Sequence, residues 1–174
     1  MEGRSTLNIG HHTNQCAHCP MSHACLPALL DKKTQQSAKY LHFHTRQLEP
    51  GDHLCRQGVA TDHFYLIRSG MLKSYIDKED GEEYVMDFYF PPELFGWEGI
   101  DEQQGAFSIV ALEHSSVCEI PTETFYALIR EHPLLQRQFI NMTAKRIHHE
   151  NTKQLRTTAE QRLSQFLLML TRHY

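Results

Sequence analysis

Short runs of β-forming residues, separated by glycine and proline turns, fill the middle of this chain from about residue 42 to residue 120. Many short strands at regular spacing predict a small barrel or jelly roll, in which a sheet closes on itself around one core. The expected strands are His42–Leu48, His53–Arg56, Phe64–Arg68, Met71–Ile76, Tyr84–Phe90, Phe107–Leu112 and Ser116–Ile120.

Helical segments are expected on both sides of this β region. One short helix fits Leu26–Tyr40, and a second is predicted at Glu123–Arg130, with Thr122 as its cap. Pro133 then begins a long helix that runs without a breaker to about Gln154. The fold class expected from this pattern is mainly β with α.

The second half of the long helix carries few apolar residues. Four positions along the helix lie close to a heptad-like seam and predict a dimer contact, with the last as the polar residue that sets register: Ile140, Ala144, Ile147 and Asn151. The run Thr158-Ala-Glu-Gln161 has capping-box form and predicts a final helix. That helix is apolar and the sequence stops soon after it, so we expect a cut chain rather than a natural terminus.

The charge balance gives no general surface for nucleic acid. The chain of 174 residues has a net charge of −4 with histidine neutral, so any contact with DNA needs a local patch or residues outside this sequence. The segment before Cys16 has no apolar run that could be a signal peptide, and no stretch approaches the ~20 residues of a membrane span. We therefore expect a cytoplasmic protein.

Three cysteines lie together as C-x2-C-x5-C at Cys16, Cys19 and Cys25. In a reducing compartment such a group indicates metal or redox chemistry rather than a structural disulfide. A thiolate site needs a fourth ligand, and the candidates are Cys55, Cys118, His18 and His23. Cys118 is the better candidate because it comes near the end of a strand, just before Pro121, whereas Cys55 is expected to be a small core residue.

Iron–sulfur clusters and zinc compete for four thiolates. Zinc more often has two C-x2-C pairs, whereas one pair with two cysteines at wider spacing suits a four-iron cube. An iron–sulfur cluster is therefore favoured, with zinc and a metal-free thiol–disulfide switch as alternatives.

Turn and strand motifs follow one another through the β region in a characteristic order: Leu48-Glu-Pro-Gly-Asp52, Gly58, Phe64–Gly70, Asp80-Gly81-Glu82 and Phe95-Gly96, followed by Pro133 and the long helix. This order resembles the effector domain of the catabolite activator and FNR superfamily of bacterial transcription regulators. The N-terminal cysteines, together with Val117-Cys118-Glu-Ile-Pro121, resemble the FNR branch in particular.

The resemblance implies a double-stranded β-helix with a cyclic-nucleotide-binding-like fold, and an oxygen-sensitive 4Fe-4S cluster on Cys16, Cys19, Cys25 and Cys118. It implies an arm with the cysteines at 1–40, a β-roll sensor at 41–130, a dimerisation helix at 131–156 and, at 157–174, the first helix of a truncated winged helix-turn-helix. The function implied is oxygen or redox sensing that controls dimerisation, in a homodimer that is not an enzyme. DNA and RNA polymerase would be partners only of the full-length regulator, and no membrane is involved.

Two other functions are open to the same fold. A cyclic-nucleotide receptor needs an arginine to hold the phosphate, but the segment from Glu98 to Phe107 has three carboxylates and neither Arg nor Lys. A cupin-type metalloenzyme is faintly indicated by His42-x-His44 with Glu49. The sequence contains no nucleophile elbow, zinc-protease motif or phosphate-binding glycine loop.

Overall fold

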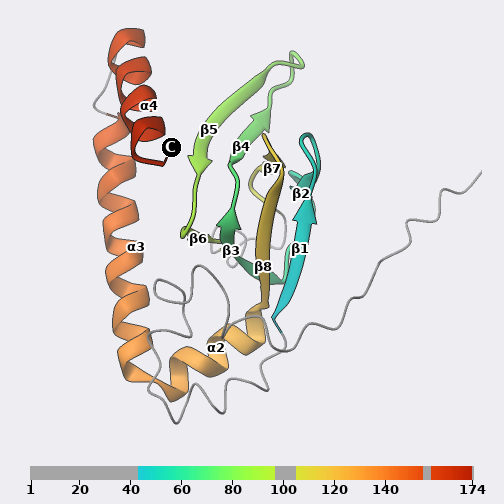
Figure 1. Ribbon diagram of the computed structural model, residues 1–174, viewed down its shortest axis with the longest axis vertical. Helices are drawn as coiled ribbons and strands as arrows, with labels where there is room; N and C mark the ends of the chain where they lie inside the picture. The colour runs from blue at the N-terminus through green and yellow to red at the C-terminus, as the bar shows by residue number, and fades with distance from the viewer. Residues whose placement is uncertain (1–42, 97–104, 155–157, 174) are drawn as a thin grey trace, which may run out of the picture. The chain divides into compact units, whose positions relative to one another are not determined.

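The computed structural model describes residues 43–96, 105–154 and 158–173 (Figure 1). The helix expected at Leu26–Tyr40 lies outside these residues. The described strands are β1 (His44–Leu48), β2 (His53–Cys55), β3 (His63–Ser69), β4 (Leu72–Asp77), β5 (Glu83–Tyr89), β6 (Leu94–Phe95), β7 (Ser108–Ala111) and β8 (Ser115–Pro121), and the helices are α2 (Thr122–Glu131), α3 (Pro133–Gln154) and α4 (Ala159–His173).

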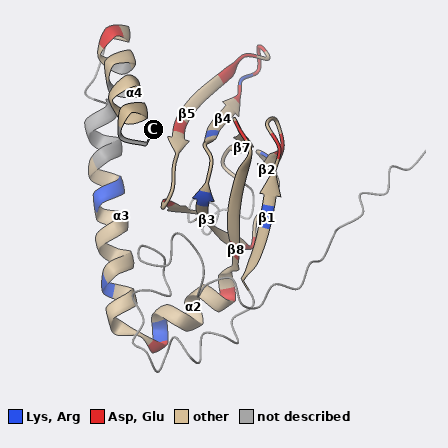
Figure 2. Cartoon of the chain, in the orientation of Figure 1, with Lys and Arg blue, Asp and Glu red and all other residues tan. Residues whose placement is uncertain are grey.

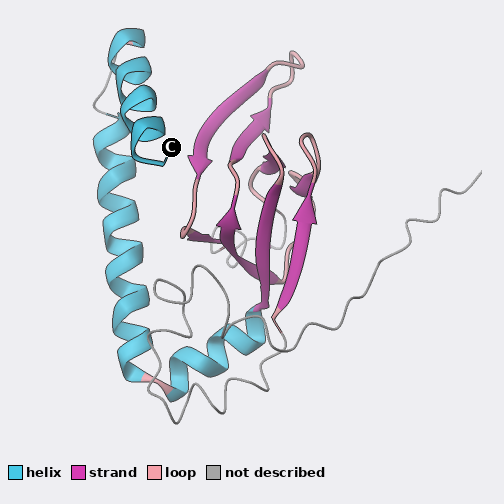
Figure 3. Cartoon of the chain, in the orientation of Figure 1, coloured by secondary structure: helices cyan, strands magenta, loops and turns pink. Residues whose placement is uncertain are grey.

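The strands of the described residues form two antiparallel sheets of four strands each (Figure 3). Sheet A has the order β1-β8-β3-β6, and sheet B has the order β2-β7-β4-β5. Both sheets contribute to one buried core, so they pack face to face. The core side chains are Leu48, Leu54, Tyr65, Ile67, Leu72, Tyr89, Phe95, Ile109, Ala111 and Val117.

Glycine turns connect the strands where the backbone needs a positive φ. Gly70, between β3 and β4, has φ +85°, and a Cβ there would collide with the side chain of Ser115 and lie 2.7 Å from the carbonyl oxygen of His114. Only glycine fits this turn without displacing the start of β8.

The sequence predicted every described strand except β6, within a few residues at each end. β6 has two residues, which pair with Tyr65 and Leu66 of β3. Two residues carry no alternation pattern, so this strand is specified by its tertiary pairing rather than by a local signal.

The chain divides into two units, Met1–Thr124 and Phe125–Tyr174. Within the second unit, Phe125 of α2 packs edge to face on Phe139 of α3, with ring centroids 5.0 Å apart. The predicted cap of the last helix is confirmed, because the backbone N–H of Gln161 donates to Oγ1 of Thr158 over 3.2 Å. No helix among the described residues is long and apolar enough to cross a membrane.

Candidate functional site around Cys118

Strand β8 places Cys118 on the face of sheet A that points away from the core. Side chains alternate along a strand, and Val117 belongs to the core, so Cys118 points to the opposite side. We call this side the outer face. Cys118 is half-buried there. It lies in the middle of β8 and not near its end, because β8 continues to Pro121 in register with His63 of β3.

The neighbours of Cys118 on the outer face come from both adjacent strands. Thr45 of β1 is directly opposite on one side, and Leu66 of β3 is directly opposite on the other. One step along the sheet, Phe64 is paired with Ile120, and both side chains are fully or almost fully buried. Cys118 therefore lies at the border of an apolar part of the outer face.

A cation extends across β8 beside this thiol. The guanidinium Nη1 of Arg68, on β3, donates a hydrogen bond of 3.0 Å to Oγ1 of Thr45, on β1. Because β8 lies between these two strands, the Arg68 side chain crosses the outer face close to Cys118. No local pattern in the sequence predicts this contact. Alternation after Phe64 and Leu66 could have put Arg68 on their face, but only the sheet order brings it to Thr45.

The N-terminal cysteines precede the strand next to Cys118. Cys16, Cys19 and Cys25 lie outside the described residues, as do His18 and His23. The described chain begins at residue 43, and β1 then runs antiparallel to β8, with His44 opposite Glu119 and Thr45 opposite Cys118. The segment that carries the three cysteines is therefore covalently joined to the strand that flanks Cys118.

Cys55 has a different environment. It packs against the core and lines a small cavity with Tyr65 and Phe95, so the prediction of a core cysteine is confirmed. Burial raises the pKa of the Tyr65 phenol, and a 2.9 Å hydrogen bond with Thr61 partly opposes that rise. A thiol directed into the barrel does not share a face with Cys118.

The described interior of the barrel has little free space. Tyr65 and Phe95 stack with centroids 5.4 Å apart, and Tyr89 packs on Phe95 at 4.8 Å. The cavity that Tyr65 and Phe95 line together with Cys55 has a volume of about 20 Å³, roughly the space of one water molecule. Most of the acidic segment expected to face a nucleotide phosphate lies outside the described residues.

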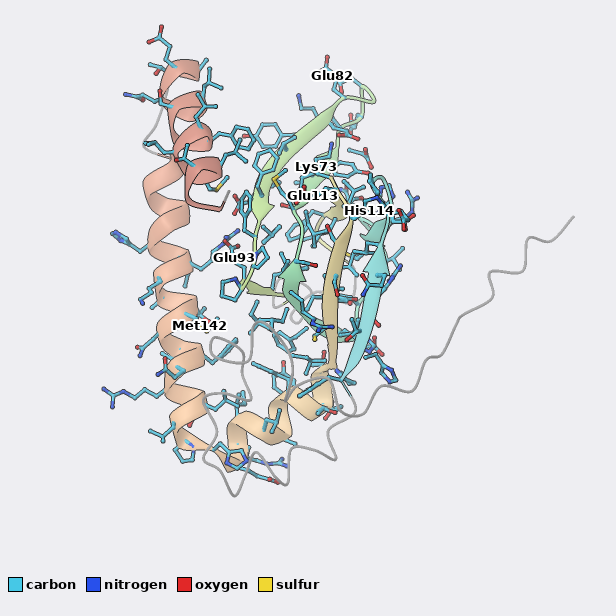
Figure 4. The ribbon with its side chains drawn as sticks, viewed as in Figure 1. Lys73, Glu82, Glu93, Glu113, His114 and Met142 are labelled. Atoms are coloured by element: carbon cyan, nitrogen blue, oxygen red, sulfur yellow. The ribbon has the colours of Figure 1, made fainter. Side chains whose placement is uncertain are left out.

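The metalloenzyme alternative gains no support from the described residues. His44 begins β1 and Glu49 directly follows its last residue, so the two are about 17 Å apart at the usual rise of a strand. Glu49 instead accepts from Nδ1 of His114 at 2.8 Å. His114 lies in the turn before β8 (Figure 4). No three His, Cys, Asp or Glu side chains in the described part of the chain converge as a metal site. His42 lies outside it.

Three side chains of the dimer contact predicted on α3 are exposed in the described part of the chain. Ile140 and Ile147 are each 57% exposed, and Ala144 between them is also exposed. The side chain of Asn151 lies outside the description. Isolated aliphatic side chains are common on surfaces, but these three recur at helical spacing on one side of the helix.

Charged side chains are mixed in sign over the described residues. Acidic residues gather at the turn between β4 and β5, and Lys and Arg are scattered along the strands and helices (Figure 2). At that turn, Lys78 pairs with Glu82 at 3.6 Å.

The described thiol suits one corner of a thiolate-bound cluster. Cys118 is half-buried and directed off the sheet, and it lies beside a cation that would favour a negatively charged group. A cluster that requires four thiolates would take its other three from the N-terminal cysteines.

Comparison with known proteins identifies the family. The family described as "Cyclic nucleotide-binding domain" matches residues 45–132. The transcriptional activator protein Anr of Pseudomonas protegens is 33% identical over 167 residues, which cover 94% of this chain and 68% of that protein. The fumarate and nitrate reduction regulatory protein of Yersinia pestis is 29% identical over 171 residues, covering 97% and 68%.

Among solved structures, the catabolite activator protein of Thermus thermophilus aligns with a TM-score of 0.60 and 26% identity, covering 72% of this chain and 58% of that one. The chain thus spans about two thirds of the length of its relatives in sequence. The predicted jelly roll is confirmed, and these relatives are regulators of transcription and not enzymes. The chain belongs to the catabolite activator and FNR family of transcription regulators.

Proposed function

We propose that this chain is the sensor and dimerisation part of an FNR-type regulator, and that it holds a 4Fe-4S cluster on Cys16, Cys19, Cys25 and Cys118. The observation that carries the proposal is the placement of Cys118 on the outer face, directly opposite Thr45 in the first described strand. The names of relatives, which include "Anaerobic regulatory protein" in Haemophilus influenzae, support oxygen as the signal.

The length of the N-terminal segment permits this ligand set. Cys25 precedes Phe43 by 18 positions, which can span roughly 60 Å when extended. The chain then enters β1, the strand next to Cys118. The segment before β1 is therefore long enough to bring the three N-terminal thiols to Cys118. When bound, the cluster supplies an iron–sulfur centre that oxygen degrades. Cys118 would hold it to β8, and the other three thiols would tie the N-terminal arm to the same sheet.

The dimer contact is proposed on the exposed side of α3. Ile140, Ala144 and Ile147 would pack against their copies across a two-fold axis, and Asn151 would set the register. Loss of the tie between arm and sheet would then shift the balance from dimer to monomer. A change of about 1–3 kcal/mol, the usual range of allosteric coupling, suffices when the contact is marginal.

The remaining partners belong to the complete regulator. DNA and RNA polymerase would be partners only of the full-length regulator, and a reducing cytoplasm would keep the thiols available. Two alternatives to the iron–sulfur cluster would use the same residues: zinc bound by the four thiolates, and a thiol–disulfide switch. Each would give a different absorbance and metal content.

The test follows cluster and association state in one sample. The chain is reconstituted with iron and sulfide under nitrogen, and absorbance and mass are measured during exposure to air. We expect the iron–sulfur absorbance and the dimer to disappear together. Cys118→Ser should abolish both, whereas Cys55→Ser, which removes the core thiol, should leave both in place. Cluster loss with an unchanged dimer would refute the coupling, and colourless protein that binds one zinc would refute the cluster.

A further inference from the structure

We propose that Arg68 is a positioning residue for the charge held at Cys118: its guanidinium, fixed by Thr45 on the outer face, stabilises the reduced, more negative state of the bound cluster. This inference rests on the proposed function. It adds to that function a residue, outside the set of thiol ligands, that adjusts the electron affinity of the centre.

Arg68 and Cys118 share the outer face of sheet A. Residues directly opposite in adjacent antiparallel strands point to the same side, so Thr45, Cys118 and Leu66 form one row on the outer face. The guanidinium of Arg68 reaches Thr45 Oγ1 at 3.0 Å from the far strand. It therefore crosses above β8 on the side where the thiol is directed.

The guanidinium of Arg68 lies at a short separation from the Cys118 sulfur. Opposed Cβ atoms are about 4.5–5.5 Å apart across a strand pair, so a guanidinium bonded to the Thr45 hydroxyl lies roughly one side chain away from the Cys118 sulfur. A guanidinium does not ligate a metal. At this separation its charge can still interact strongly with a charged group in a half-buried site.

The positive charge of Arg68 would favour the reduced state of a bound cluster. Four thiolates outweigh the positive charge of the cluster core, and adding an electron makes the site more negative still. A fixed cation near one ligand favours the reduced state, and surrounding charge is among the factors that set the potentials of such clusters. Loss of the cation should change the equilibrium constant for one-electron reduction by about tenfold.

The chain offers a matched control, an arginine on the opposite face of the same sheet. Arg46 is the neighbour of Thr45 in β1, but its side chain points to the core face and contacts Glu119 at 3.5 Å and the carbonyl oxygen of His53 at 3.1 Å. Arg46→Gln removes one arginine charge from the same sheet, but from its core face, and leaves the charge on the outer face in place.

The experiment is anaerobic spectroelectrochemistry of the reconstituted chain. Arg68→Gln should lower the midpoint potential by about 59 mV, which corresponds to a tenfold change for one electron. Arg68→Lys should keep most of the wild-type potential, and Thr45→Val, which frees the guanidinium, should give a smaller shift than Arg68→Gln. Arg46→Gln should change the constant less than threefold. Thermal denaturation of the apo proteins separates a loss of folding from a change of potential.

The outcomes distinguish the two proposals. If the wild-type chain binds no iron and sulfide, the proposed function fails and this inference fails with it. If the wild type binds the cluster but Arg68→Gln keeps the wild-type potential, the inference is overturned and the proposed function stands. If Arg68→Gln fails to fold, Thr45→Val takes its place, and an unchanged potential in Thr45→Val overturns the inference in the same way. Equal shifts for Arg68→Gln and Arg46→Gln would also overturn it, because a general effect of charge removal would then explain both.

Discussion

Replacement of Ile147 by alanine should weaken the dimer of the cluster-loaded chain. Ile147 is 57% exposed in the single chain, so most of its side chain is available to a second copy. Its place on α3, seven residues after Ile140, puts both side chains on the same side of the helix.

The size of the effect follows from the exposed area. Full burial of an isoleucine side chain contributes about 1.5–3 kcal/mol, so covering the exposed part of Ile147 contributes about 1–1.5 kcal/mol. A two-fold contact buries two copies, and alanine retains some of the area. The expected loss is about 2 kcal/mol per dimer, or roughly a 30-fold increase in the dissociation constant.

Sedimentation velocity under nitrogen, over a series of protein concentrations, measures that constant. Leu134→Ala is the control, because Leu134 is 69% exposed on the same helix but lies about 120° around its axis from Ile140. It should leave the dimer unchanged. A change of less than threefold for Ile147→Ala, or equal changes for both variants, would refute the seam.

Two further predictions concern the barrel. Gly70→Ala should lower the free energy of unfolding by about 2–4 kcal/mol, from strain at positive φ and the collision with Ser115, whereas Gly58→Ala, with φ +80° and open space around it, should cost only about 1 kcal/mol; equal urea midpoints would contradict this. Because burial raises the pKa of Tyr65, the folded chain keeps the phenol proton to higher pH than the unfolded chain. Stability should fall as the pH rises above about 10, the ordinary tyrosine value, and urea titrations should show a shallower fall for Tyr65→Phe; an unchanged slope would refute this.

The strands could be predicted because their signal is local. Runs such as Phe64–Arg68 and turns such as Gly70 carry alternation and backbone requirements in adjacent residues. The cap at Thr158 could be predicted for the same reason, since its partner Gln161 is three residues away. The strand β6 could not, because two residues form it only through pairing with β3.

The sequence suggests candidate ligands for the site, and the structure adds the surroundings of one of them, Cys118, which the sequence does not predict. Cys118 could be singled out because an incomplete group of three cysteines requires a fourth. Thr45 and Arg68 could not, because they meet only when β1, β8 and β3 line up in that order. The position of Cys118 within β8 was also misjudged, since strand length depends on the pairing with β3 beyond that residue.

The most direct test of the central claim is an anaerobic absorption spectrum with iron and sulfide counts per chain, for the wild type, Cys118→Ser and Cys55→Ser. We expect about four irons and four sulfides per chain in the wild type and in Cys55→Ser, with broad visible absorption, and a loss of most of both in Cys118→Ser. Full iron and sulfide content in Cys118→Ser, or zinc in place of iron in the wild type, would contradict the assignment of Cys118 as the ligand that holds an iron–sulfur cluster to the barrel.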